Sequence, residues 1–390
     1  MMSLTLFLLL GLLLARDGME HARLQLVMER DWIRDQARSV AVLLEENEEL
    51  LTKEEVTRIF HDIPVQVKRI SEAWGLFNVE WLISETAHLR DTTLFLCGNA
   101  RASEDSTALY FPGEAGNYLS VAGETELRGV CYLPPLGARK GYVQGRGYYK
   151  DSVVYGEIRQ AGKELPRLSS AHVERWERFT RVEESEELVL PVDRSFTTSS
   201  MTFYSLFPVT LSAIQIKGHA RVVSAEKIEV DSSSLLYHCL LVAPVIKIHK
   251  GFAGKVQLFA SDTIVIDSNA TLLYPSVVYL NASGKGALIE TRRGATVAGV
   301  ILITGEEEPL YLMHPGSVLH GQLYNSGVTQ LEGTVYGPAY LRKTRFYNEQ
   351  GEHENIIRDG IIDNGKPAGN RPCLDLFQPG TRAPVMEVVW

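Results

Sequence analysis

The chain has 390 residues, of which 45% are hydrophobic and 22% charged, and its formal net charge is -9. This composition excludes a largely disordered chain, and the length suffices for two or three domains. Nucleic-acid binding requires concentrated positive charge, and the sequence has no run of five Lys or Arg residues, so we expect no nucleic-acid partner.

The N-terminal segment "MMSLTLFLLLGLLLARDG" is apolar almost throughout from Leu4 to Ala15. This run is shorter than the ~20 residues of a membrane-spanning helix, and it lacks the basic start of a signal peptide. Three interpretations remain open: an atypical signal peptide, a short anchor, or half of a longer helix that begins upstream. A buried core helix is a fourth. We expect a single membrane anchor in the inner membrane, with most of the chain in the periplasm.

The next segment has helical spacing of apolar residues, from Glu20 to about Leu51, without glycine or proline. Thr52 and Glu55 then form a capping-box pattern, which predicts a second short helix ending near Phe60. Residues 1–60 are therefore predicted to form a membrane anchor and a helical stalk.

From residue 61 the period changes to short alternating segments separated by glycines, as in "GYVQGRGYY". We expect a Gly-rich region of short strands at 61–165, with glycine at tight corners or close backbone approaches. Residues 166–212 are predicted to be a linker with entry strands and one helix. Ser169 or Ser170 would cap that helix, which would contain His172, Trp176 and Phe179.

An internal repeat follows at 213–345. Two sets of apolar residues recur at intervals of 18, with polar turn residues after each set. A constant interval with short strands predicts a stacked β-solenoid, whereas a β-sandwich, the second choice, needs no constant interval. Residues 346–390 are expected to form a polar C-terminal cap or tail. The two sets are Ile228, Ile246 and Ile264, and Val230, Ile248 and Ile266.

The chain is thus predicted to be mainly β: an N-terminal membrane-proximal helix, a short-strand β region and a right-handed β-helix. Four scattered cysteines, Cys97, Cys131, Cys239 and Cys373, show no zinc-site spacing, so we expect no metal and no other cofactor. A Cys97–Cys131 bridge would suit an oxidising compartment, but the tendency of cysteine to be buried favours free thiols.

One edge of the predicted solenoid carries candidate ligand residues. Asp231 and Asp267 are 36 residues apart, or two periods, with His249 midway between them. Two turns correspond to ~10 Å, near the upper end of the carboxylate separation in inverting glycosidases. Arg292 and Arg293 could contact an anionic glycan. The alternative is that these are ordinary corner residues, since Asp favours turns through local hydrogen bonds. We assign no residue a catalytic role.

The stretches "LVAPVIKIHKGFAGKVQLFASDTIVID" and "LEGTVYGPAYLRKTRF" resemble uncharacterised envelope proteins of Bacteroidota, which have one N-terminal membrane helix and a β-solenoid. The glycine spacing of "GTVYGPAYL" loosely resembles that of bactofilins, which polymerise. A polar tail after the last repeat argues against end-to-end stacking. The order of membrane helix, extended helix and β region also resembles pilin-like subunits, although the Gly-Phe-Thr-Leu-x-Glu cleavage motif is absent.

These observations favour a non-enzymatic, membrane-anchored envelope protein. Its expected role is structural or assembly-related, as a scaffold or as part of a pilin-like or surface apparatus, with other envelope or assembly proteins as partners. The alternative is a β-helix protein that binds or cleaves glycans. Fold alone does not decide between them.

Overall fold

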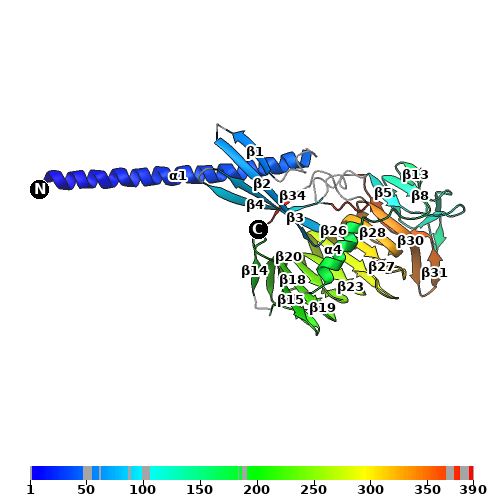
Figure 1. The fold of residues 1–390 in the computed structure, drawn as a ribbon. Helices are drawn as coiled ribbons and strands as arrows, with labels where there is room; N and C mark the ends of the chain where they lie inside the picture. The colour runs from blue at the N-terminus through cyan, green and yellow to red at the C-terminus, as the bar shows by residue number, and fades with distance from the viewer. Residues whose placement is uncertain are drawn as a thin grey trace. The chain divides into compact units, whose positions relative to one another are not determined.

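The computed structural model describes residues 2–46, 55–60, 63–86, 89–98, 106–182, 184–186, 191–365, 373–377 and 386–389 (Figure 1). The chain divides into two compact units. The first, here the helix–sheet unit, contains Met1–Glu72, Val79–Cys97 and Thr381–Val389. The second, the solenoid unit, contains Ala73–Asn78, Gly98–Gly380 and Trp390.

The helix–sheet unit consists of one long helix and a five-stranded sheet in the order β1-β2-β3-β4-β34. β1 pairs antiparallel with β2, and β34 pairs antiparallel with β4. The elements are α1 (Met2–Glu46), β1 (Glu55–Phe60), β2 (Ile63–Trp74), β3 (Phe77–Glu85), β4 (Arg90–Cys97) and β34 (Met386–Val389).

Helix α1 is continuous through the apolar run and the segment from Glu20 that was expected to be helical. Among the described residues, no helix has a stretch long and apolar enough to cross a membrane, so the expected transmembrane helix is not found. The later part of α1 contacts the sheet within this unit: Ile33 is fully buried, Arg34 Nε lies 2.9 Å from Asp91 Oδ2, and Thr86 Oγ1 donates to Glu29 Oε1 at 3.1 Å.

The prediction of a short helix ending near Phe60 is wrong, because Glu55–Phe60 forms strand β1. Its residues pair with β2 from Glu55↔Lys68 to Phe60↔Ile63. Thr52, the first residue of the capping pattern, lies outside the described residues. A local capping signal is a weak determinant, and the long-range pairing available to these residues overrides it.

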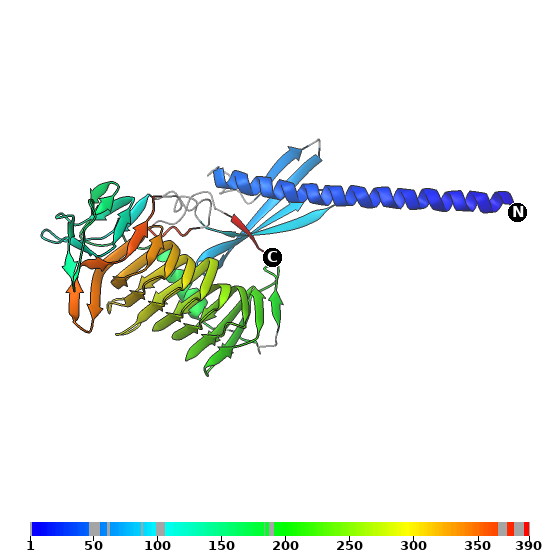
Figure 2. The ribbon, with the colours of Figure 1, turned by 180° about the vertical axis from the view of Figure 1, so that it is seen from behind.

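The solenoid unit is built from three columns of parallel strands, one strand from each column per turn, as seen from the other side in Figure 2. Column A comprises β16 (Val209–Leu211), β19 (Lys227–Val230), β21 (Val245–Ile248), β23 (Thr263–Ile266), β25 (Leu288–Thr291), β27 (Leu310–Met313) and the end of β28 (Val318–Leu331).

The long strands cross a corner and contribute to columns B and C in turn. They are β20 (Leu235–Val242), β22 (Ala253–Ala260), β24 (Thr271–Asn281), β26 (Thr296–Thr304) and β28. Column B begins with β14 (Val192–Arg194) and β17 (Gln215–Gly218), and column C with β15 (Met201–Ser205) and β18 (Ala220–Ser224).

The predicted repeat is confirmed. Ile228 pairs with Ile246 and Ile246 with Ile264, and the second set pairs in the same register, Val230 with Ile248 and Ile248 with Ile266. All six side chains are fully buried in one continuous core. The prediction of a mainly β chain with an N-terminal helix, a short-strand region and a parallel solenoid therefore holds.

The stack continues first with strands that follow the repeat in the sequence and then with strands that precede it. Column B runs on through β29 (Thr334–Tyr336), β33 (Ile361–Asp363), β7 (Glu126–Arg128) and β12 (Val154–Tyr155). Column C runs on through β30 (Ala339–Asn348), β5 (Thr107–Tyr110), β8 (Val130–Leu133) and β13 (Ile158–Gln160). Figure 1 shows the cyan strands β5 and β8 next to the orange β30.

The Gly-rich region and the predicted solenoid therefore belong to one sheet network. The expected cap at residues 346–390 does not end the stack. Its strand β33 pairs with β29 on one side and with β7 on the other, so the stack continues beyond it. The remaining strands are β31 (Gly351–Glu354), antiparallel to β30, the sheet β32-β6-β9 (Ile356–Arg358, Leu119–Ala122, Ala138–Lys140) and the hairpin β10–β11 (Tyr142–Val143, Arg146–Gly147).

The outer side of column C is covered by three segments of the solenoid unit: Ala73–Asn78, helix α4 (Ser170–Thr180) and Cys373–Phe377. Ser169 caps α4, as predicted, and Trp176 stacks on Phe259 at 5.8 Å. Two outward glutamines hold the other segments by paired hydrogen bonds. The Gln257 amide bonds Trp74 O and Leu76 N, both at 2.9 Å. Gln322 bonds Leu374 O and N at 2.9 and 2.8 Å.

No disulfide joins the cysteines among the described residues, as favoured, and Cys97, Cys131 and Cys239 are buried.

The expected role of glycine at close backbone approaches in region 61–165 is confirmed at Gly156, where an added Cβ would lie 2.1 Å from the carbonyl oxygen of Gly129. Other glycines stack at the corner between columns B and C. Gly299, Gly321 and Gly337 occupy this corner in successive turns with φ near +143° (143, 144 and 143). A Cβ on Gly321 would lie 1.8 Å from the carbonyl oxygen of Gly299, and one on Gly337 would lie 2.2 Å from that of Gly321. No side chain fits between these turns.

We predict that Gly321→Ala lowers the free energy of unfolding by at least about 2 kcal/mol, because the methyl group meets backbone and φ is unfavourable for alanine. Urea titration followed by circular dichroism measures this. Gly284→Ala is the matched control, since nothing lies within 4 Å of the added Cβ and φ is unstrained there. Equal stability of the two variants would contradict the prediction.

Candidate functional site

The structure places the predicted edge residues on one corner of the solenoid. Asp231, His249, Asp267 and Arg292 directly follow the paired strands β19, β21, β23 and β25. The backbone confirms the alignment, since His249 N donates to Val230 O and Asp267 N donates to Ile248 O, both at 2.9 Å. Arg293 is the next residue of the same turn as Arg292.

The side chains of Asp231, His249, Asp267 and Arg292 each have a local partner. Asp231 Oδ1 accepts the Ser233 N–H at 3.0 Å, which is the turn-capping role of an Asp at a corner. His249 Nε2 lies 2.9 Å from Glu229 Oε2. Arg292 bridges Asp267 at 3.4 Å and Glu290 at 3.1 Å. The edge is therefore a ladder of paired charges.

The ladder includes residues that the sequence analysis missed. His314, in the next turn, lies 2.9 Å from Glu290 Oε1. Lys227 pairs with Glu229 from the other side. The signal was present in the sequence, because Lys227, Glu229 and Glu290 occupy the outward positions of strands that otherwise carry buried Ile and Val.

The electrostatics of the edge do not match those of a general acid. Hydrogen bonds from Lys227 and His249 lower the pKa of Glu229 to about 2. The pKa of Asp231 is lowered by its hydrogen bonds to Ser233. For Asp267, burial raises the pKa, but the Ser268 amide and Arg292 outweigh it and the net direction is down. A carboxylic acid that protonates a leaving group needs a raised pKa.

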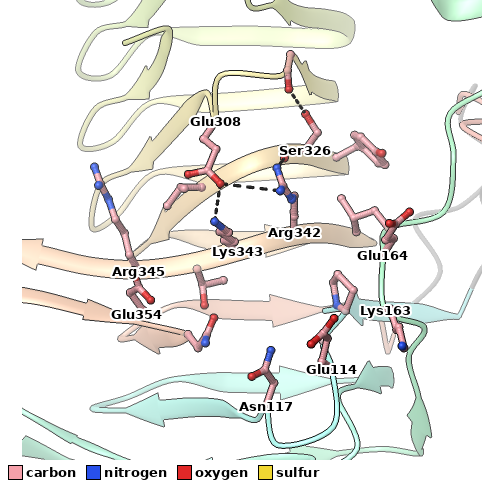
Figure 3. Close-up of a pocket in the computed structure, with 18 of the residues that line it drawn as sticks. Glu114, Asn117, Lys163, Glu164, Glu308, Ser326, Arg342, Lys343, Arg345 and Glu354 are labelled. Atoms are coloured by element: carbon pink, nitrogen blue, oxygen red, sulfur yellow. Dashed lines mark hydrogen bonds and ion pairs between the residues drawn. The ribbon is translucent and has the colours of Figure 1, made fainter. Parts of the chain in front are cut away.

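A separate polar pocket of about 660 Å³ lies farther along the solenoid unit (Figure 3). Its walls are β28 and β30, the turn at Gly305 and Glu308, and the segments 112–117 and 163–165. Charged side chains of both signs line it. They are Glu114, Lys163, Glu164, Glu308, Arg342, Lys343, Arg345, Glu352 and Glu354.

Ion pairs neutralise most of the cations in this pocket. Glu308 pairs with Lys343 and lies 3.9 Å from Arg342, as the dashed lines in Figure 3 show. Arg345 Nη1 lies 3.1 Å from Glu352. Lys343 lowers the pKa of Glu308. The pocket could accept a polar ligand through hydrogen bonds. The sequence signal for this pocket was the pair of charged segments "GEEEP" at 305–309 and "LRKTR" at 341–345.

Comparison with known proteins adds little. No protein-family model and no curated protein match the chain. Among solved structures, it aligns with the competence-associated pilin ComZ from Thermus thermophilus over 87% of this chain and 86% of that chain, with 10% identity and a TM-score of 0.22. A TM-score of that size does not establish a common fold.

The ion pairs of the ladder make the free energy of unfolding depend on pH in the acidic range. The pKa of Glu229 falls from 4.5 to about 2 on folding, so its contribution is present above pH 4.5 and is lost as the pH falls towards 2. We predict that the urea midpoint of the wild type drops between pH 5 and pH 2.5 more than that of Glu229→Gln. Parallel pH dependence of the two proteins would contradict this role for Glu229.

Proposed function

We propose that the chain is a non-catalytic structural or assembly component of a cell-envelope apparatus built from pilin-like subunits. In this proposal α1 packs against helices of neighbouring subunits, and the solenoid provides a rigid binding surface. The proposed location is the periplasmic side of the inner membrane.

The observation that supports the proposal is the exposed apolar surface of α1. Large apolar side chains from Leu9 to Met28 are solvent-exposed, with Leu12 at 69% and Met28 at 71%. Contiguous exposed apolar surface of this kind marks an interaction site. The later part of the same helix is fixed to its sheet through Ile33 and the Arg34–Asp91 pair. Within the described residues, the apolar side chains of the earlier part stay exposed to solvent.

Charge placement favours protein helices as the partner of this surface. Arg16 and Glu20 pair at 3.1 Å along the helix, and further charged residues alternate with Leu24, Leu26 and Val27. A helix with apolar and charged residues interspersed suits a bundle in which apolar side chains interlock and charges reach the rim.

The solenoid suits a scaffolding role. Its core is continuous, with inward columns of Ile, Val and Leu that are almost fully buried, and each turn is hydrogen-bonded in register to the next. Such a stack resists bending and keeps side chains on its surface at fixed spacing. The paired, ionised edge residues described above support a surface function over acid–base chemistry.

We predict that replacing Leu12 and Leu13 by glutamate abolishes higher-order association of the full chain without changing its urea midpoint, because both side chains are already exposed. Sedimentation velocity with and without inner-membrane vesicles measures association. Val173→Glu on α4, also at an exposed apolar position, is the control and should behave as the wild type. A wild-type chain that stays monomeric and does not bind vesicles would refute the proposal.

A further inference from the structure

The end of the solenoid stack that contains β12 and β13 is uncapped among the described residues. Solenoids normally close each end with a polar capping unit, because the terminal turn otherwise exposes core positions and an unpaired strand edge. In column C the inward positions of the last three turns are Leu109, Cys131 and Ile158. Leu109 and Cys131 are fully buried, but Ile158 is 56% exposed.

The backbone of β13 also has a free edge. Cys131 N donates to Glu157 O and Ala161 N donates to Leu133 O, both at 2.8 Å. Along a parallel strand, the backbone N–H and C=O groups of successive residues point alternately to the two neighbouring strands. The C=O of Glu157, the backbone N–H and C=O of Arg159, and the N–H of Ala161 therefore face β8. The N–H and C=O groups of Ile158 and Gln160 therefore point away from the stack. Among the described strands, β8 alone is paired in register with β13, on the opposite side.

The side chains of β13 are self-complementary. Glu157, the residue before β13, and Arg159 lie on one face, on either side of Ile158, and pair within the chain at 2.7 Å. If two copies of β13 run antiparallel about a twofold axis through Ile158, Glu157 of each copy is opposite Arg159 of the other. Ile158 then faces its own copy in the hydrogen-bonded position, which matches the outward direction of its N–H and C=O groups.

We propose that two copies of this chain join end to end through antiparallel pairing of β13 with β13, closing both cores with an Ile158–Ile158 contact and two reciprocal Glu157–Arg159 pairs. The interface is isologous, as twofold contacts are, and so it makes a closed dimer. Exposed Tyr149 and Tyr155 lie in the same terminal turn, and tyrosine is enriched at the energetic centre of interfaces. This inference does not depend on the role proposed for α1.

The end-to-end contact differs from the polymer excluded in the sequence analysis. A polar tail at residues 346–390 would prevent stacking only if it closed the stack, whereas the terminal turn is formed by β12 and β13. A twofold contact at this end leaves the other end, at β14–β16, outside the interface.

The first test is a cross-link in the full chain. Antiparallel hydrogen-bonded partners have Cα atoms about 5.5 Å apart, which is within disulfide range. Ile158→Cys should give a covalent dimer of twice 43.5 kDa under mild oxidation. The wild type, whose own cysteines are buried or half-buried, and Lys227→Cys on a central strand are controls that should stay monomeric on a denaturing gel. If the Ile158→Cys variant forms no covalent dimer, the proposal is overturned.

The second test is a charge swap. Arg159→Glu places like charges opposite each other and should raise the dimer dissociation constant about tenfold, since two cross-strand pairs are reversed. The double variant Glu157→Arg/Arg159→Glu restores both pairs and should recover wild-type association. Lys227→Glu, which disrupts a matching pair two residues apart in β19, should have no effect. Equal dissociation constants for the single and double variants overturn the proposal.

Discussion

The in-register parallel hydrogen bonding of each solenoid turn to the next is the constraint on which the rest of this structure depends. A single turn cannot bury its apolar residues, so the core exists only because Ile228, Ile246 and Ile264 lie directly above one another. The same register forces backbone into contact at the corners. That is why Gly321 has no room for a side chain and why polar corner residues align into a charge ladder.

Stacking also explains how distant parts of the chain meet. A strand edge pairs with any suitable strand, whatever its place in the sequence, and β30 and β33 receive β5 and β7 from the region that precedes the repeat. The order of the turns in space is thus a circular permutation of their order in the sequence. One consequence is that the terminal turn is built from residues 138–160, which lie within the first half of the sequence.

The two units differ in what they leave uncovered. In the solenoid unit, α4 and two short segments cover the apolar outer side of column C, and Gln257 and Gln322 satisfy the polar groups of those segments. In the helix–sheet unit, the first half of α1 keeps its leucines exposed. The free edge of β13 is the corresponding gap in the solenoid. Among the described residues, both are places where apolar side chains stay exposed.

The sequence by itself determined the solenoid, because an interval of 18 residues between Ile and Val positions reports the stacking of successive turns. It also determined the alignment of Asp231, His249 and Asp267, and it limited the cap of α4 to Ser169 or Ser170, of which the structure shows Ser169. Only the tertiary structure decided that Glu55–Phe60 is a strand, that the Gly-rich region extends the same stack and that residues after 345 do not close it. It also decided the partners of the edge, such as Glu290 with His314. The reason is physical: periodicity reports on contacts between equivalent residues of neighbouring repeats, whereas pairing between non-repeating segments depends on which edges are free after the repeats have stacked.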